Sequence, residues 1–275
     1  MNDQQPTSEE QLYRLDLRYI GTPFQGWQSQ TNGSGIQDHV ERALATILRH
    51  PTRVVGASRT DSGVHAEHQV ATFRTPIAFD EIRWLKSLNG ILPPEIGVTA
   101  VQPVVAAFHP IYSARGKAYR YRLWQGATRH PMLTPYVWTL HRDLDREAMR
   151  RAAASLVGTH DFTSFCALDS SAKTRVRQVL EISISDHGPL VDIWVVGKGF
   201  LKQMIRIMVG TLVEIGMGKR APEDMANIIL AQNRDAAGIT APANGLTLIE
   251  IFYGDVLTSA ALKDRMGHSF NLNVT

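Results

Sequence analysis

A short loop between two predicted strands carries the side chains of this sequence that are best suited to chemistry. It runs from residue 56 to residue 65 with the sequence GASRTDSGVH, and its glycines let the backbone turn tightly. Asp61 supplies the one carboxylate of the loop, and Arg59 lies two positions before it. A loop held by rigid neighbouring elements can present such a carboxylate outward, where it can act as a nucleophile or a general base.

Two other interpretations of this loop stay open on residue types alone. The first is structural, because an Asp in a turn commonly hydrogen-bonds its own backbone, and Asp61 would then take no part in chemistry. The second is a metal site, for which Asp61, His65 and His68 could supply three ligands. No matching cluster of ligands occurs elsewhere in the chain, so we expect no bound metal.

A strip of basic residues without carboxylates follows in the middle of the chain. The 275 residues carry 29 Lys and Arg against 26 Asp and Glu. Residues 1–107 have 9 basic and 11 acidic side chains, whereas residues 108–275 have 20 and 15. No acidic residue occurs between Glu95 and Asp143. The aromatic residues interleaved with the cations of this interval are Tyr112, Tyr119, Tyr121 and Trp124. This pattern suits a phosphodiester backbone and unstacked bases, although an edge strand guarded by Arg would look the same.

The composition is that of an ordinary globular protein, with 44% hydrophobic and 20% charged residues. The single cysteine, Cys166, cannot form a disulfide within the chain, so the fold needs no oxidising compartment. The first eleven residues lack the basic and apolar regions of a signal peptide. No apolar run approaches the roughly 20 residues that cross a bilayer. We therefore expect a soluble cytoplasmic protein that does not enter a membrane.

Hydrophobic periodicity predicts the same order of elements in both halves, strand–helix–strand–strand–helix–strand. In the first half we expect them near residues 13–19, 36–47, 53–57, 69–74, 79–88 and 96–103. Ser34 and Gln37 are expected to cap the first helix, and Asn89-Gly90 to end the second. In the second half we expect them near residues 118–125, 146–158, 176–185, 190–196, 201–215 and 246–253, with a short helix from Pro222.

This repeated order predicts an α+β fold of two ferredoxin-like β-α-β-β-α-β units. We expect the units to pack around a central mixed, mostly antiparallel sheet with an active-site cleft between them. The predicted limits are a polar extension over 1–11, an N-terminal domain over 12–107, a C-terminal domain over 108–253 and a tail without periodicity over 254–275.

Several separated segments of the chain form an ordered set with the Asp61 loop. They read YIGTPFQGWQ at 19–28, GKAYRY at 116–121, GTHDFTSF at 158–165, GFLKQMIRIMVG at 199–210 and NGL at 244–246. Together with the loop, this set resembles the motifs of the TruA family of tRNA pseudouridine synthases over about residues 12–253. A single motif of this kind would be weak, whereas the ordered series is specific.

The resemblance implies that Asp61 is the catalytic carboxylate of an isomerase. In that family the reaction breaks the N1 glycosidic bond of a uridine, turns the freed uracil and rejoins it through C5, with no cofactor and no metal. The implied substrate is the tRNA anticodon stem-loop at positions 38, 39 and 40, and the implied assembly is a homodimer. A buried Asp61 would have its pKa raised by desolvation, and its ionised form therefore needs a nearby cation.

The resemblance also implies roles for residues outside the loop. Arg206, on the predicted apolar helix, is the cation expected near Asp61, although an Arg at a helix margin can also simply extend to water. Tyr119 matches the tyrosine that packs against the target base. Arg59 matches the residue that enters the space left by the flipped uridine. Leu246 is expected to support the pocket, first of all by packing.

Basic side chains in the matching segments are expected to contact the RNA backbone. They are Lys117, Arg120, Lys198 and Lys202. The sequence departs from the family pattern at Ser58 and Ser62, where Gly and Ala are usual, and at Ile111, where an arginine is usual. The last difference removes one expected RNA contact and bears on substrate scope.

The expected site draws on both halves of the chain, because Asp61 and Arg59 come from the first and Tyr119 and Arg206 from the second. A non-catalytic RNA-binding protein with two ferredoxin-like units is the alternative, and it needs exposed aromatic rings on its sheet but no loop carboxylate. A metal-dependent hydrolase is a third interpretation, and it predicts that chelators abolish activity.

Overall fold

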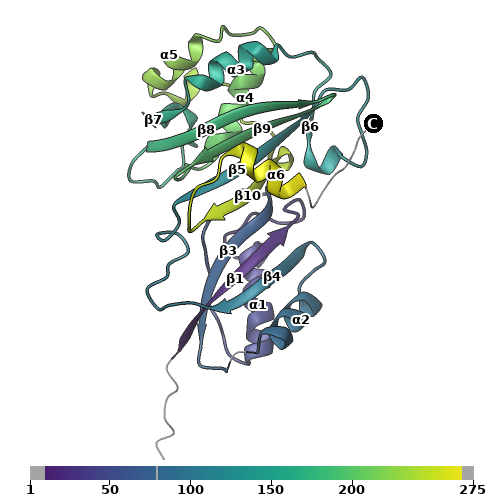
Figure 1. Cartoon of the computed structure of the whole chain (residues 1–275), viewed down its shortest axis with the longest axis vertical. Coiled ribbons are helices and arrows are strands. Elements are labelled where there is room, and N and C mark those ends of the chain that lie inside the picture. The colour runs from purple at the N-terminus through teal and green to yellow at the C-terminus, as the bar shows by residue number, and fades with distance from the viewer. Residues whose placement is uncertain (1–9, 79, 268–275) are drawn as a thin grey trace, which may run out of the picture. The chain divides into compact units, whose positions relative to one another are not determined.

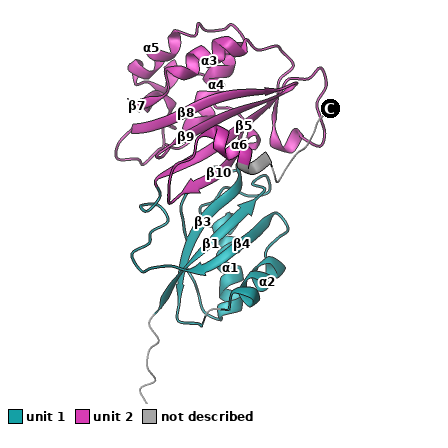
Figure 2. Ribbon diagram, in the orientation of Figure 1, with its two compact units in different colours: residues 1–114 teal, residues 115–275 magenta. Residues whose placement is uncertain are grey.

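The computed structural model describes residues 10–78 and 80–267. Contacts divide the chain into two compact units, unit 1 (Met1–Ala114) and unit 2 (Arg115–Thr275), which are coloured separately in Figure 2. This division falls after the boundary predicted between residues 107 and 108, and the functional domain limits stay a prediction. Within the described ranges, no helix has the length and apolar character needed to cross a membrane.

Unit 1 has the predicted order of elements (Figure 1). They are β1 (Gln11–Tyr19), α1 (Ile36–Leu48), β2 (Val55–Gly56), β3 (His65–Thr75), α2 (Glu81–Ile91) and β4 (Ile96–Pro103). The strands lie in the order β4-β1-β3-β2 with antiparallel neighbours, which is the ferredoxin-like order.

The core of unit 1 lies between one face of this sheet and the two helices. Alternation along β1 turns Tyr13, Leu15, Leu17 and Tyr19 to that face, where all four are buried. Tyr13 meets Trp84 of α2 edge to face, with ring centroids 5.0 Å apart. The predicted strand period is confirmed.

The N-cap of the first helix lies one residue after its predicted position at Ser34. Gly35 is the N-cap, and its backbone N–H donates to Asp38 Oδ2 at 2.9 Å. The Ser34 hydroxyl instead donates to Asn32 Oδ1 at 2.6 Å, so it cannot serve the helix. The cap predicted from Ser34 and Gln37 is therefore wrong by one position, because a loop hydrogen bond takes the hydroxyl.

The second helix, α2, is shifted toward the C-terminus of its predicted range. Asp80 caps it through a side-chain hydrogen bond of 3.0 Å, and the predicted start at Phe79 lies outside the described residues. The helix continues past Asn89 because the Asn89 amide donates to Leu85 O and pairs with the backbone of Val98. These partners turn an expected stop residue into a link between α2 and β4.

Unit 2 repeats the strand order of unit 1 with additions. Its strands are β5 (Gly116–Trp124), β6 (Trp138–Thr139), β7 (Gly158–Asp161), β8 (Val176–His187), β9 (Leu190–Gly197) and β10 (Leu246–Phe252). Its α-helices are α3 (Arg146–Ala154), α4 (Met204–Gly216), α5 (Asp224–Ala231) and α6 (Ser259–Gly267). Short 3₁₀ helices cover Thr134–Tyr136, Thr163–Phe165, Arg234–Ala236 and Ala243–Gly245. The order β10-β5-β9-β8 is again ferredoxin-like, β7 extends the edge, and β6 pairs with β5 in parallel.

Two helix limits of unit 2 differ from the predictions. The helix expected over 146–158 begins at residue 146, where Ala148 N donates to the capping Asp145 Oδ1 at 2.8 Å, but it ends at Ala154 and Gly158 opens β7. The helix expected from Leu201 begins only at Met204, because Gln203 adopts a left-handed conformation with a φ of 61°.

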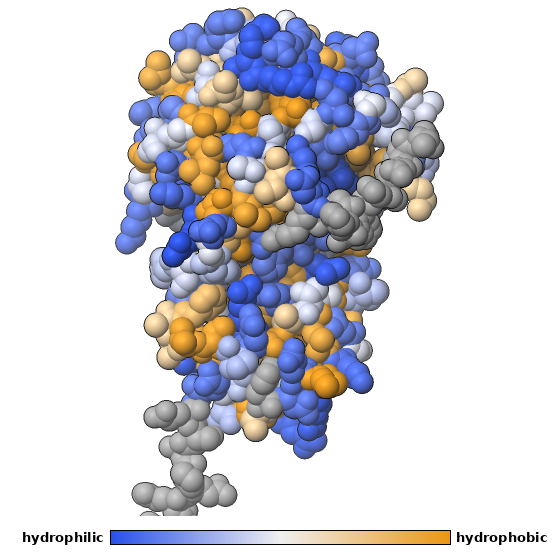
Figure 3. Space-filling model, viewed as in Figure 1, coloured by the Kyte–Doolittle hydropathy of each residue, from blue (hydrophilic) through white to orange (hydrophobic). Residues whose placement is uncertain are grey.

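The tail, predicted to lack periodicity, forms α6 on the face of the unit 2 sheet opposite α4 (Figure 1). Its fully buried Leu262 joins Ala118 and Trp194 in one apolar cluster. Ser259 N donates to Glu181 Oε2 at 2.9 Å. On the face seen in Figure 3, apolar side chains gather over β8 and β9 beside α6. Helix α6 packs through one buried leucine and through polar contacts, so its sequence shows little hydrophobic periodicity. For this reason the sequence did not predict it.

Candidate active site

The loop that carries Asp61 joins β2 to β3 and is fastened to β3 by one side chain. Gln69 Oε1 accepts the N–H of Ser58 at 3.1 Å, and Gln69 Nε2 donates to Ser58 O at 2.6 Å and to the Tyr19 hydroxyl at 3.3 Å. The Tyr19 hydroxyl also pairs with Thr60 Oγ1 at 2.8 Å. Backbone and side-chain bonds thus hold the loop on both sides of Arg59.

Trp27 fastens the same loop from the other side. Its backbone N–H donates to Thr60 O at 3.0 Å, and its ring lies against Gly56. A Cβ at Gly56 would lie 2.3 Å from that ring, so only glycine fits. Gly26, with a φ of 84°, approaches Thr60 O so closely that a Cβ there would lie 2.8 Å from it. The loop is therefore packed backbone against backbone and is rigid at its base.

The reactive candidates project from this base. The Asp61 carbonyl accepts Val64 N at 3.1 Å and closes a turn, while the Asp61 side chain is half-buried. Arg59 and Ser62 are exposed, and the Ser62 hydroxyl donates to Phe24 O at 3.1 Å. A half-buried carboxylate on a fixed turn, beside an exposed guanidinium, can meet a substrate that approaches the loop.

The histidines of the alternative metal interpretation have other partners. The buried His65 accepts Gly21 N at its Nδ1, at 3.1 Å. His68 Nε2 lies 3.8 Å from Asp16 Oδ1 and 3.5 Å from an Arg14 nitrogen. Within the part of the chain that the structure describes, no three His, Cys, Asp or Glu residues are grouped as metal ligands.

Unit 2 places Tyr119 on the face of its sheet that α4 covers. Strand alternation gives Lys117, Tyr119 and Tyr121 the same face, and Tyr119 is 7% exposed. Phe200 meets the Tyr119 ring edge to face, with centroids 5.4 Å apart and planes at 88°. Burial lowers the pKa of Lys117 to about 8. Tyr121 is fully buried and belongs to the core of unit 2.

Arg206 lies near the start of α4 and is held by the segment before β10. Its Nε donates to Ala241 O at 2.8 Å, and its carbonyl accepts Ala241 N at 3.1 Å. The Tyr121 hydroxyl donates to Pro242 O at 2.8 Å. Burial raises the pKa of Tyr121, and the positive charge of Arg206 opposes that rise. Arg206 is thus a positioned cation on the same face as Tyr119.

Leu246 opens β10 and pairs with Tyr121 of β5 in the sheet. It is buried, at 5% exposure. The preceding Gly245 lies against the Tyr121 ring, where a Cβ would be 2.6 Å from the nearest ring atom. Leu246 therefore packs in the core of unit 2, in keeping with the first role expected for it.

The four cations expected to contact RNA do not share one face. Lys117 lies on the Tyr119 face, whereas Arg120 lies on the opposite face with its guanidinium 5.6 Å from the Trp194 ring centroid. Lys198 is exposed after β9. Lys202 is exposed and pairs with Asp169.

Comparison with known proteins gives the family. A family model described as tRNA pseudouridine synthase matches residues 152–254. A protein of Syntrophotalea carbinolica named tRNA pseudouridine synthase A is 44% identical over 242 residues, which are 88% of this chain and 96% of that protein. A protein of the same name from Bacillus licheniformis is 44% identical over 244 residues, 87% of this chain and 98% of its own. The chain belongs to the tRNA pseudouridine synthase A family.

A solved structure titled as a Cbf5-Nop10-Gar1 complex is far less similar. It covers 86% of this chain and 48% of its own, at 13% identity and a TM-score of 0.34. That likeness is too weak to add to the family assignment, which rests on the tRNA pseudouridine synthase A relatives.

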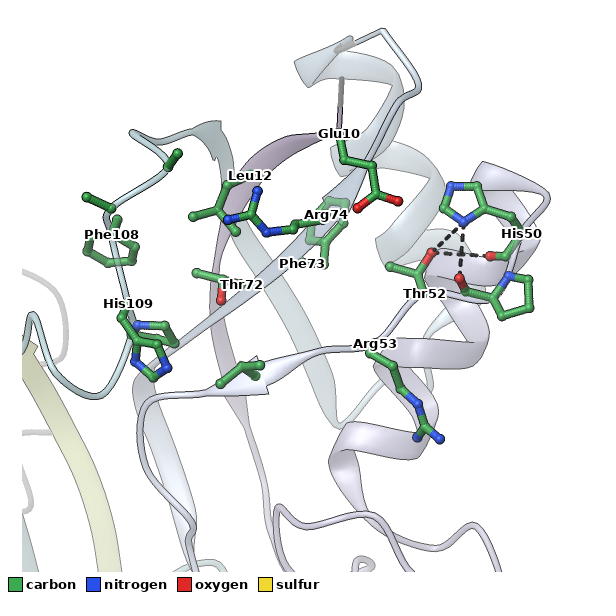
Figure 4. Close-up of a pocket in the computed structure, with 15 residues that line it drawn as sticks. Glu10, Leu12, His50, Thr52, Arg53, Thr72, Phe73, Arg74, Phe108 and His109 are labelled. Atoms are coloured by element: carbon green, nitrogen blue, oxygen red, sulfur yellow. Dashed lines mark hydrogen bonds between the residues drawn. The ribbon is translucent and has the colours of Figure 1, made fainter. Parts of the chain in front are cut away.

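Unit 1 also contains a hollow of about 500 Å³ (Figure 4). Its lining consists of residues 10, 12, 50–53, 55, 72–74 and 106–110. Figure 4 shows Arg74 between the Glu10 side and the Phe108–His109 side. None of the residues predicted for the synthase site lines it.

Three residues that hold the Asp61 loop or the Tyr119 ring in place were not predicted as functional. They are Gln69, Trp27 and Phe200. Gln69 had a sequence signal, because period 2 puts it on the inner face with Ala71 and Phe73, where a polar side chain needs partners. Trp27 and Phe200 lie in family motifs, but their contacts across loops have no periodic signal.

Proposed function

We propose that this protein isomerises uridine to pseudouridine in the tRNA anticodon stem-loop, at positions 38, 39 and 40. The observation that carries the proposal is the half-buried Asp61 on a clamped turn, in a chain of this family. The reaction breaks the bond from C1′ to N1, turns the uracil and forms a bond from C1′ to C5. The C5 proton leaves to solvent and N1 gains a proton, so the product is an isomer.

Asp61 is the catalytic group of this proposal, acting as nucleophile or base in its ionised form. A uracil that fills the site would remove water and disfavour the charged carboxylate. Arg206 supplies the compensating cation, and its two bonds to Ala241 support a fixed position.

Tyr119 packs against the target uracil. Its edge-to-face contact with Phe200 supports a fixed ring, which a stacking partner requires. Arg59, exposed two positions before Asp61, enters the space that the flipped uridine leaves. Flipping costs a few kcal/mol, roughly, and least in a loop or at a stem end, which suits an anticodon stem-loop.

The remaining parts of the proposal concern partners. The RNA backbone is contacted by four basic side chains, Lys117, Arg120, Lys198 and Lys202. The protein works as a cytoplasmic homodimer without cofactor or metal. Phosphate contacts release counterions, so tRNA binding weakens as salt rises.

Release of tritium from uracil C5 tests the function directly. Wild type incubated with tRNA tritiated at C5 should release tritium to water, and Asp61→Asn should release none while still binding tRNA. Asp143→Asn, an exposed position of the same residue type, serves as the matched control and should behave as wild type. Release by Asp61→Asn at the wild-type rate would reject the assignment of Asp61. Binding without release by wild type would favour the non-catalytic RNA-binding alternative.

A further inference from the structure

Five basic residues lie in two chain segments, one from the loop after β7 into the start of β8 and the other just after β9, and backbone hydrogen bonds join these segments. The backbone joins these segments, since Lys198 N donates to Gln178 O at 3.0 Å and Ala167 N donates to Lys202 O at 3.1 Å. Phe162 N donates to Arg175 O at 3.1 Å. We call this group the basic cluster, and its members are Lys173, Arg175, Arg177, Lys198 and Lys202.

The arginines of the basic cluster are held by backbone carbonyls. Arg177 Nη1 donates to Thr174 O at 2.9 Å and to Val176 O at 2.7 Å, and Arg175 Nη2 donates to Ser170 O at 3.5 Å. Partial burial lowers the pKa of Arg177, Cys166 raises it, and the like charge of Arg175 lowers it further. Carbonyl partners orient these guanidinium groups without neutralising them, so their positive field persists.

Asp169 pairs with a lysine of the basic cluster. The segment 166–177 contains a single acidic residue, Asp169. Its Oδ2 lies 2.6 Å from Lys202 Nζ. Both side chains are exposed, at 72% for Asp169 and 46% for Lys202. An exposed ion pair is weak, so a second anion can replace the carboxylate readily.

We propose that the basic cluster binds tRNA phosphates and that the Asp169 carboxylate stays paired with Lys202 until a phosphate displaces it. This inference rests on the proposed function, which identifies the RNA as tRNA. It adds that Asp169 lowers the affinity for tRNA. The chemistry that recognises the cluster is the phosphodiester, whose oxygens accept hydrogen bonds from ammonium and guanidinium groups.

Removal of the carboxylate tests the role of Asp169. In Asp169→Asn, Lys202 is released and one negative charge leaves the cluster, so tRNA affinity at low salt should rise by roughly two- to fivefold, the strength of an exposed ion pair. Fluorescence anisotropy with labelled tRNA measures this affinity, and Asp143→Asn should bind as wild type. An Asp169→Asn variant that binds like wild type, or more weakly, would overturn the proposal.

Lys202→Ala supplies the second measurement. Loss of one phosphate contact should weaken tRNA binding and reduce the slope of log affinity against log salt by about 1. Asp169→Asn should also tighten binding less in the Lys202→Ala background, because the ion pair is already gone. An unchanged salt slope would contradict the proposal. Tritium release by wild type tests the proposed function separately. If wild type releases tritium and Asp169→Asn binds tRNA as wild type does, only this inference is rejected.

Discussion

The side chain of Gln69 forms two hydrogen bonds with the backbone of Ser58, one at each end of its amide. Gln69 is fully buried in β3, and Ser58 lies three residues before Asp61. A strand of the core thus fixes the backbone that presents the candidate catalytic carboxylate. The pair links fold stability to site geometry.

Replacement of Gln69 by leucine should therefore destabilise unit 1 and impair the reaction together. Leucine has a similar volume but leaves the Ser58 N–H and carbonyl without this partner, at a cost of about 1–3 kcal/mol per buried group. Urea unfolding measures the loss, and C5 tritium release measures the site. Gln102→Leu, at an exposed position of β4, is the control and should change neither. If Gln69→Leu were as stable as wild type, the stabilising role of the hydrogen bonds between Gln69 and Ser58 would be contradicted.

A methyl group at Gly56 should be much more harmful than one at Gly90. A Cβ at Gly56 lies 2.3 Å from the Trp27 ring, which must move, whereas a Cβ at Gly90 in α2 meets nothing within 4 Å. Gly56→Ala should cost about 1–3 kcal/mol. Gly90→Ala should be neutral or stabilise by about 0.5–1 kcal/mol, because it reduces the freedom of the unfolded chain. Thermal unfolding of the two variants checks the contrast, and equal effects would argue against close packing at Trp27.

The elements that the sequence predicted well are those with a strong local period. The predicted range 96–103 coincides with β4, and the alternation along β1 gave the inner face of that strand. The repeated element order also led to the correct fold class, because both units have the ferredoxin-like strand order. Local pattern is sufficient where burial on one face decides the structure.

The parts that escaped prediction depend on single contacts between distant residues. The Ser34 hydroxyl bonds Asn32 and leaves the cap position to Gly35, and Asn89 continues a helix because Val98 satisfies its amide. Helix α6 depends on Leu262 and on polar contacts to β8. The roles of Asp61 and Tyr119 came from family resemblance, because a loop carboxylate and a buried ring have common structural explanations.

Arg14 Nε lies 2.6 Å from Asp16 Oδ1, and this ion pair should make the unfolding free energy depend on pH in the acid range. Burial raises the pKa of Asp16, but the nearby His68 ring and the hydrogen bonds and charge of Arg14 together outweigh it, so the folded-state pKa lies below the ordinary value. The stabilisation is complete above the unfolded pKa of about 3.9 and is lost as pH falls through the folded value. Asp16→Asn should cost about 1.5–3 kcal/mol near pH 7. Unfolding of both proteins from pH 7 to pH 3 should show the difference shrinking, and a constant difference would contradict the ion pair.

Because the pKa of Lys117 is low, the affinity for tRNA should fall at alkaline pH. Burial lowers that pKa to about 8, so the ammonium loses its proton between pH 7 and pH 9. If Lys117 contacts a phosphate as proposed, affinity should fall by about tenfold over this range, the worth of one charge-assisted hydrogen bond of ~1.5 kcal/mol. Lys117→Arg keeps its charge and should show a flat profile.

Folding stability separates this effect from alkaline unfolding. Since the folded state of wild type releases the Lys117 proton more easily than the unfolded chain, this group makes the unfolding free energy rise between pH 8 and about 10.4. Binding should therefore weaken while the contribution of Lys117 to stability increases. Parallel decline of tRNA affinity in wild type and Lys117→Arg would show that another group sets the limit.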